Sequence, residues 1–278
     1  MKHALSILLV LSLLLVFAAC GDDEKNDSTY TTSNLPSRYA VDIPKTLKGG
    51  STTPKAPKQI RGLAPESMAL QQIKNDVSQF EMMQKQVPMQ FVLVDAVMPT
   101  LLQRIGDKTE VSADDLKMTI SQTLLDKIKA IMGDELYNEM ANMGMPPVGM
   151  EFPLGPITYK KSPNETPYQH MIVMEMTNET GSDKTVIRWS TDKTKVSIGY
   201  HTVFSGSESS QLCTFDSEKN TSFMSFKFDN MTITMAFEQT DKAKRGVKIK
   251  STSKWTMEGT TTIYETVGVA DDNGGYLE

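Results

Sequence analysis

The stretch KVSIGYHTVF, residues 195–204, alternates apolar and polar side chains. Its apolar members Val196, Ile198, Tyr200 and Phe204 fall on one side of an extended chain. A period of two is typical of a β-strand with one buried face and one wet face. The stretch therefore predicts a sheet that packs on one side and meets solvent on the other.

Two later stretches repeat this period. MTITMAFE, residues 231–238, places four apolar side chains on one face, and GVKIKSTSKWTM, residues 246–257, alternates apolar side chains with three lysines. Segments rich in Gly, Asn, Asp and Ser separate such stretches and are typical of turns. About nine strands are expected, at residues 157–161, 169–177, 185–190, 195–204, 211–216, 222–229, 231–239, 247–257 and 260–267. Short connections then predict an antiparallel β-meander, curled as a barrel, a half-barrel or a twisted sheet.

The chain before residue 146 has the spacing of helices instead. Between Leu70 and Ile105, apolar residues recur at alternating steps of three and four. An interior proline removes a hydrogen bond and clashes with the preceding turn. We therefore predict one helix to about residue 86, a break at Pro88, and a more apolar helix that kinks near Pro99.

A third helix is expected to start at Ser112, where SADD offers an N-cap and an acid three residues later. Leu116, Ile120, Leu124 and Ile128 then recur every fourth residue. Gly133 should end or bend this helix, which resumes over DELYNEMANMG. The next residues, MGMPPVGMEFPLGP, are too rich in Pro and Gly for regular structure.

The predicted fold class is α+β, with N-terminal helices packed on a C-terminal antiparallel β-meander. The apolar face of the meander needs a cover, which the helices can supply. The expected divisions are a signal peptide at 1–19, a disordered tether at 20–62, a helical segment at 63–145, the meander at 146–270 in one domain with that segment, and a flexible tail at 271–278.

Residues 1–19, MKHALSILLVLSLLLVFAA, have one lysine, then an uncharged apolar core, then small residues. This layout is typical of a secretory signal, and the apolar run is too short for a spanning helix. Phe17, Ala18, Ala19 and Cys20 resemble the lipobox of bacterial lipoproteins, although its first position is usually Leu. The resemblance implies cleavage before Cys20 and lipidation of its thiol. An ordinary secretory signal with an incidental Cys20 is the alternative.

The segment after the cysteine, GDDEK, is strongly acidic. By resemblance to lipoprotein sorting rules, Gly21 argues against retention in an inner membrane, and GDDE is similar to the acidic export signals of bacterial surface lipoproteins. A plain solvated charge run is the other interpretation. We expect a bacterial envelope location at the outer membrane, facing the periplasm or the cell surface. We expect the protein to attach to the membrane through the lipid on Cys20.

Composition narrows the classes of partner. The chain of 278 residues has 29 Lys plus Arg against 34 Asp plus Glu, a formal net charge of −5. Such an acidic balance offers no electrostatic footprint for nucleic acid. The 19 methionines favour core packing over an adaptable ligand surface. Cys213 has no intramolecular partner if Cys20 is lipidated, and it is expected to be a small buried hydrophobe.

The chain has no HExxH, phosphate-loop, GxSxG or EF-hand pattern, and DDNGG near its end lacks the ligand spacing of a calcium loop. His170 is expected to be a satisfied buried imidazole and His201 a surface residue. Trp189, Tyr200 and Trp255 could form a sugar-stacking platform, but core packing is the default for strand aromatics. No catalytic residue, metal or cofactor is expected.

Three functions compete on these observations. The first is a non-catalytic binding or scaffold module of the envelope, with a protein, a glycan or a lipid as its partner. The second is a carrier or sensor of an apolar ligand between the meander and the Met-rich helices, an arrangement similar to the half-barrel lipoprotein carriers of the outer membrane. The third, an enzyme that acts on glycans through paired carboxylates, has no motif behind it.

Overall fold

The structure is a computed structural model, and it describes residues 87–277. Gaps in that description fall at residues 89, 93, 135–136, 139–140, 142–146, 165, 179–180, 242–245, 258–259 and 272–273. The signal peptide, the lipobox with Cys20, the tether and the first predicted helix lie outside the described residues. Those interpretations remain predictions.

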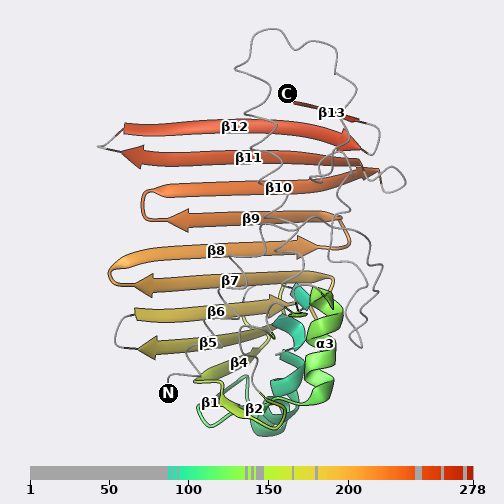
Figure 1. The fold of residues 1–278 in the computed structure, drawn as a ribbon, viewed down its shortest axis with the longest axis vertical. Coiled ribbons are helices and arrows are strands. Elements are labelled where there is room, and N and C mark those ends of the chain that lie inside the picture. The colour runs from blue at the N-terminus through green and yellow to red at the C-terminus, as the bar shows by residue number, and fades with distance from the viewer. Residues whose placement is uncertain are drawn as a thin grey trace.

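One large antiparallel sheet dominates the described chain (Figure 1). It has 11 strands in the order β1-β4-β5-β6-β7-β8-β9-β10-β11-β12-β13. The nine predicted strands are all present, as β4 (Ile157–Lys161), β5 (His170–Asn178), β6 (Gly181–Trp189), β7 (Lys195–Phe204), β8 (Ser207–Asp216), β9 (Thr221–Phe228), β10 (Met231–Asp241), β11 (Gly246–Met257) and β12 (Thr260–Asp271). The antiparallel meander is thereby confirmed.

The sheet is open rather than closed. β1 and β13 stand at opposite ends of the strand order, and within the described residues neither pairs with the other. Each connection from β4 to β12 is short, so every strand lies beside its sequence neighbour, and no described pairing joins the last strand to the first. The barrel that we listed as one possible form of the meander is therefore wrong for this part of the chain.

The segment predicted to be purely helical contains two strands, so the N-cap predicted at Ser112 is wrong. Ser112 lies in β1 (Glu110–Ala113), where its Oγ is 2.9 Å from the Oγ1 of Thr158 on β4. Strand β2 (Lys117–Thr119) follows, and helix α3 (Gln122–Met132) begins only after it. The true N-cap is Ser121, whose Oγ accepts a hydrogen bond of 3.1 Å from the N–H of Leu124.

Pairing also orders two segments that were predicted to be irregular. Strand β3 (Glu151–Pro153) lies within the Pro-rich and Gly-rich stretch and pairs with β2. Strand β13 (Gly274–Leu277) lies within the predicted flexible tail and pairs with the end of β12, where Leu277 opposes Gly268. In both cases a partner strand satisfies backbone groups that local sequence alone would leave to water.

The described residues of the second predicted helix, from 87 to 105, are all helical. Residues 87 and 88 are helical, so the break expected at Pro88 is not there, and the helix continues through Pro99. Gly133 has a φ of +84° and caps α3, as its position predicted. The helix then resumes, since residues 134, 137, 138 and 141 are helical.

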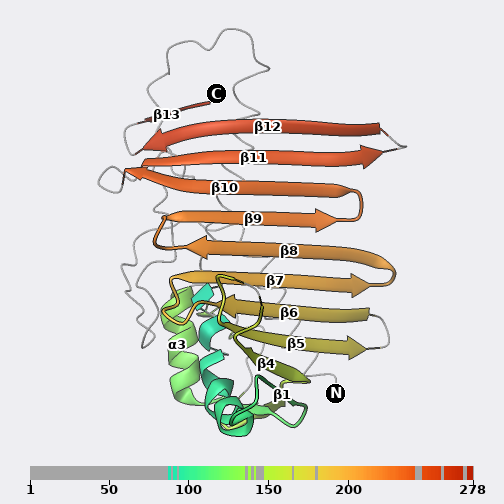
Figure 2. The ribbon, with the colours of Figure 1, turned by 180° about the vertical axis from the view of Figure 1, so that it is seen from behind.

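Helix and sheet share one apolar core. Phe91, Leu101 and Ile105 of the helix over residues 87–105 belong to the same buried cluster as side chains of β4 to β11. The helices lie at the β4–β7 end of the sheet (Figures 1 and 2). We call the side of the sheet that carries this cluster the core face. A row of directly opposed residues crosses it, namely Tyr159, Ile172, Ile187, Ile198, Cys213, Met224 and Met235.

The opposite side of the sheet is the open face. The neighbouring row of opposed residues on that side is Met171, Arg188, Ser197, Thr214, Phe223, Ala236 and Lys250. This row mixes polar and apolar side chains, unlike the uniformly buried row on the core face. One packed face and one mixed face are the arrangement that the alternating sequence predicted.

Ser222 carries a polar group that the core does not satisfy. Its side chain is 5% exposed, it lies between the opposed residues Phe215 and Phe237, and its Oγ has no hydrogen-bond partner. An unsatisfied buried hydroxyl costs about 1–3 kcal/mol. We expect Ser222→Ala to raise the free energy of unfolding by roughly 1 kcal/mol, measured by urea denaturation. Ser197→Ala is the comparison, and a loss of stability in Ser222→Ala would contradict this account.

Candidate functional site

The two histidines singled out by sequence lie on opposite faces of the sheet. His170 opposes Trp189 on the core face, whereas His201 opposes Lys184 on the open face. His201 forms an exposed pair with Glu208, at 3.2 Å between Nε2 and Oε1. The structure therefore does not bring the two imidazoles together. Within the described residues, no group of three His, Cys, Asp or Glu side chains is placed to hold a metal ion.

His170 belongs to an aromatic stack. Its Nδ1 lies 2.9 Å from the hydroxyl of Tyr159, and its ring stacks on Trp189 with 5.3 Å between centroids. Partial burial lowers the pKa of His170 below its ordinary value, and the nearby lysines 161 and 193 lower it further. The imidazole is hydrogen-bonded, as the sequence predicted, but it is half-buried rather than buried.

The three aromatic residues proposed as a platform do not form one. Trp189 is 4% exposed, and its ring meets Phe91 edge-on at 5.8 Å. Tyr200 accepts a hydrogen bond of 2.8 Å from Nε2 of Gln90, and burial raises the pKa of its hydroxyl. Trp255 stacks instead on Tyr264, four strands away from Tyr200 in the sheet. For Trp189 and Tyr200 the default of core packing is confirmed.

Cys213 is buried, with 1% of its surface exposed. Burial raises the pKa of its thiol to about 12, so the thiolate needed for nucleophilic attack is scarce at neutral pH. The prediction of a small buried hydrophobe at this position is confirmed.

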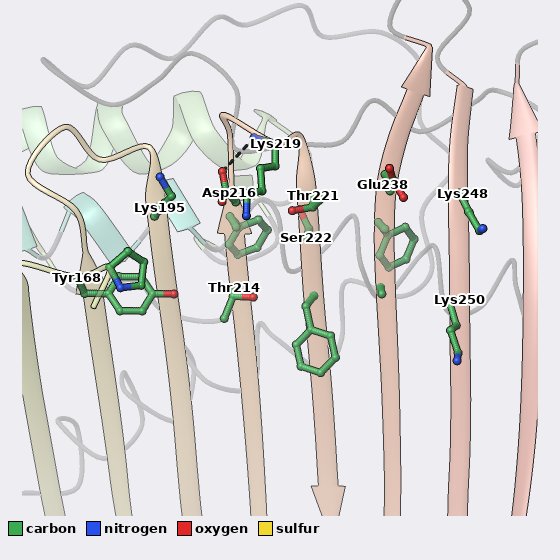
Figure 3. Close-up of a pocket in the computed structure, with 15 residues that line it drawn as sticks. Tyr168, Lys195, Thr214, Asp216, Lys219, Thr221, Ser222, Glu238, Lys248 and Lys250 are labelled. Atoms are coloured by element: carbon green, nitrogen blue, oxygen red, sulfur yellow. Dashed lines mark hydrogen bonds between the residues drawn. The ribbon is translucent and has the colours of Figure 1, made fainter. Parts of the chain in front are cut away.

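A pocket of about 540 Å³ lies across β8 to β11 on the open face (Figure 3). Two rows of opposed residues make its floor. The first row is Thr214, Phe223, Ala236 and Lys250, and the second is Asp216, Thr221, Glu238 and Lys248. Tyr168, from the connection between β4 and β5, adds an aromatic ring at one side. We call this the open-face pocket.

The charge of the open-face pocket is opposite in sign to that of the chain. Four lysines line it, at 195, 219, 248 and 250, against two carboxylates, Asp216 and Glu238. Lys195 pairs with Glu218, and Lys250 lies 3.7 Å from a carboxylate oxygen of Glu265. Within the described residues, Lys219 and Lys248 have no ion-pair partner, so their ammonium groups are available to a ligand.

Asp216 is committed to the local turn. Its Oδ1 accepts hydrogen bonds from the backbone N–H groups of Glu218 and Lys219, at 3.1 and 3.0 Å. These bonds hold the β8–β9 turn, and so they fix where Lys219 leaves the backbone. Asp216 therefore serves to shape the rim of the pocket.

A second pocket, of about 490 Å³, adjoins the first and shares Pro167 and Lys195 with it. Asp192 fixes its wall by accepting bonds from Ser190 Oγ at 2.5 Å and from the N–H of Thr194 at 3.1 Å. These bonds lower the pKa of Asp192 to about 2. Gln169 Oε1 also accepts a bond of 2.9 Å from the N–H of Thr191, so the loops beside the open-face pocket are held in place.

Sequence reasoning did not find the open-face pocket. The alternation predicts lysines on the wet side of the 246–257 strand, but it does not tell which of them shares a row of opposed residues with Phe223. That adjacency depends on the register of four strands.

Comparison of the chain with protein-family models, with curated proteins and with solved structures found no match. In the part of the chain that the structure describes, no helix is long and apolar enough to cross a membrane. The chemistry of the site therefore rests on its own residues.

Proposed function

We propose that the chain is a lipid-anchored module of the bacterial envelope that binds a carboxylated glycan in the open-face pocket without catalysis. The lipobox-like segment ending at Cys20 supports the anchor, and the α+β core supports a rigid sheet that presents its other face. The observation that carries the binding proposal is the open-face pocket, which joins aromatic rings and unpaired lysines on an exposed surface.

The lining of the pocket favours an acidic sugar over other ligands. Phe223 is 36% exposed and can cover the apolar face of a sugar ring, as Tyr168 can from the side. Thr214 and Thr221 supply hydroxyls for hydrogen bonds with sugar hydroxyls. Lys219 and Lys248 supply cations for a carboxylate. The volume of about 540 Å³ falls within the usual range for small-ligand sites.

The other two functions fit less well. An apolar carrier needs an apolar cavity between helices and sheet, whereas the open-face pocket lies on the other side of the sheet and has six charged residues in its lining. A glycan-acting enzyme needs a carboxyl pair free for acid and base roles. Asp216 is bound to two backbone N–H groups instead.

Titration calorimetry with oligogalacturonate tests this function. We expect Lys248→Glu to weaken binding by about tenfold or more, because it replaces a charge-assisted contact by repulsion. Lys254→Glu is the matched control, since Lys254 lies on the same strand and face but does not line the pocket. Phe223→Ala should also weaken binding, whereas full methyl esterification of the probe should abolish the dependence on Lys248.

Two results would refute the proposal. Equal binding by Lys248→Glu and Lys254→Glu would show that the open-face pocket is not the site. Release of shorter sugars from the probe would show an enzyme rather than a binding module.

A further inference from the structure

Strand β12 leaves part of one backbone edge unpaired in the described structure. On one side it pairs with β11 along its length, from Thr260 to Ala270. On the other side β13 pairs only with Gly268 to Asp271. No described strand lies beside residues 260–267, so the N–H and C=O groups that alternate residues of this stretch direct away from β11 have no described strand partner.

The sequence of this edge lacks the usual protection against strand pairing. Natural edge strands are blunted by shortness, lysines, prolines or bulges. Residues 260–267 read TTTIYETV, with high β-propensity, one charge, no proline and no lysine, and their pairing with β11 is continuous. At the other end of the sheet, β1 is only four residues long and carries the Glu110–Lys160 ion pair.

Exposed apolar side chains flank the same edge. Ile263 is 57% exposed and Tyr264 is 58% exposed. Ile263 opposes Lys254 on the open face, whereas Tyr264 opposes Ser253 on the core face, where its ring stacks on Trp255 at 4.9 Å. A strand added at β12 would therefore bury apolar surface on both faces as well as pair the backbone.

We propose that β12 pairs antiparallel with β12 of a second copy of this chain, to form a two-fold symmetric dimer with one continuous sheet. An occupant of this edge has to stop before Leu277, the last residue of β13, which lies opposite Gly268. A second copy meets that condition, because its own unpaired stretch has the same length and its own β13 lies at the opposite end. This inference is independent of the glycan function proposed above.

The position of β13, which covers only Gly268 to Asp271 of β12, also selects the register of the dimer. A two-fold axis perpendicular to the sheet keeps side chains of each face together, so a residue opposes one of equal parity. With Ile263 opposite Ile263 of the second copy, Thr260 opposes Thr266, and Glu265 opposes Thr261 rather than another acid. The next register would place Thr260 opposite Gly268, whose edge is taken by Leu277. The Ile263 register therefore pairs residues 260–266 of both copies without bringing Thr260 onto the position of Leu277.

Disulfide trapping in the full chain tests the register. Directly opposed side chains have Cβ atoms about 4.5–5.5 Å apart, close enough for a disulfide after small movements. We expect Ile263→Cys to form a covalent homodimer on intact bacterial membranes treated with copper phenanthroline. Thr261→Cys is the matched control on the same strand and face, because the two Thr261 positions would lie roughly 13 Å apart. The parent chain gives the background, since Cys213 is buried.

Sedimentation velocity of the detergent-extracted full chain supplies a second measurement. Ile263→Lys should convert the dimer to a monomer, because it places two ammonium groups opposite each other. Phe204→Lys is the control, since Phe204 is similarly exposed at 61% but lies at the β7–β8 turn. A monomeric parent chain, equal cross-linking at 261 and 263, or trapping of a different envelope protein by Ile263→Cys would each overturn the proposal.

Discussion

Replacing Phe91 by alanine should lower the free energy of unfolding by about 3–5 kcal/mol, the usual cost of emptying a core phenylalanine site. Phe91 is fully buried, meets Trp189 edge-on at 5.8 Å, and has Nζ of Lys193 5.5 Å from its ring centroid. It joins the helix over residues 87–105 to β6 and to the loop after it. The loss should therefore weaken the attachment of the helix to the sheet.

Urea denaturation followed by circular dichroism measures this loss. Leu102→Ala is the matched control, since Leu102 lies on the same helix but is 52% exposed. We expect its effect to stay within about 0.5 kcal/mol. If Phe91→Ala lost less than about 1 kcal/mol, the helix would contribute little to the core of the sheet.

Replacing Cys20 by serine should release the protein from the membrane. The thioether to the lipid needs the thiol, and stable anchoring needs more than one acyl chain. With serine at this position the chain either keeps its signal peptide uncleaved or is released without a lipid. We expect the mature protein to move from the membrane fraction to the soluble fraction, or the precursor to accumulate. Fractionation of cells and the intact mass of the purified protein measure both outcomes.

Ala19→Ser is a control for this experiment, because it keeps a small residue before the cysteine and leaves the thiol in place. Mature protein that carries no lipid mass, with the same distribution in the Cys20→Ser variant and in the parent chain, would favour the ordinary secretory signal. In that case the membrane would no longer be a partner of this chain.

The strands were predictable because their signal is local. In β7 the buried Val196 and Ile198 alternate with residues of the other face, and both of its predicted ends, Lys195 and Phe204, match the structure. In β8 the prediction began four residues late, because Ser207 to Ser210 contain no apolar residue. A strand end without a buried face leaves no periodic signal.

The segment from Ser112 to Ile120 shows how a local signal can mislead. Leu116 and Ile120 are four residues apart, a spacing that fits a helix and also fits two steps of a strand. Both residues are buried, but they lie on either side of strand β2, before α3 begins, and not in a helix. Pairing of β1 with β4 and of β2 with β3 decided between the two conformations. The partner residues 157–160 and 151–153 lie too far along the chain for local spacing to detect.

The candidate site was less predictable than the fold. Phe223, Lys248 and Thr214 come from three different strands, and only the successive pairing of β8 with β9, β9 with β10 and β10 with β11 brings them to one pocket. Tyr168 arrives from a loop near β5, and no pattern in the sequence ties it to them. By contrast, the burial of Cys213 followed directly from its parity with Phe215.

The sequence by itself determined the alternating strands, their order as neighbours and the division into a packed and a wet face, because each depends on residues close together in the chain. It also supplies the signal at Cys20 on which the envelope proposal rests. Only the tertiary structure decided that the sheet stays open, that β13 covers part of the β12 edge, and that lysines and aromatic rings meet on the open face. Those features depend on strand register and on edges, where residues distant in sequence compete for the same backbone hydrogen bonds.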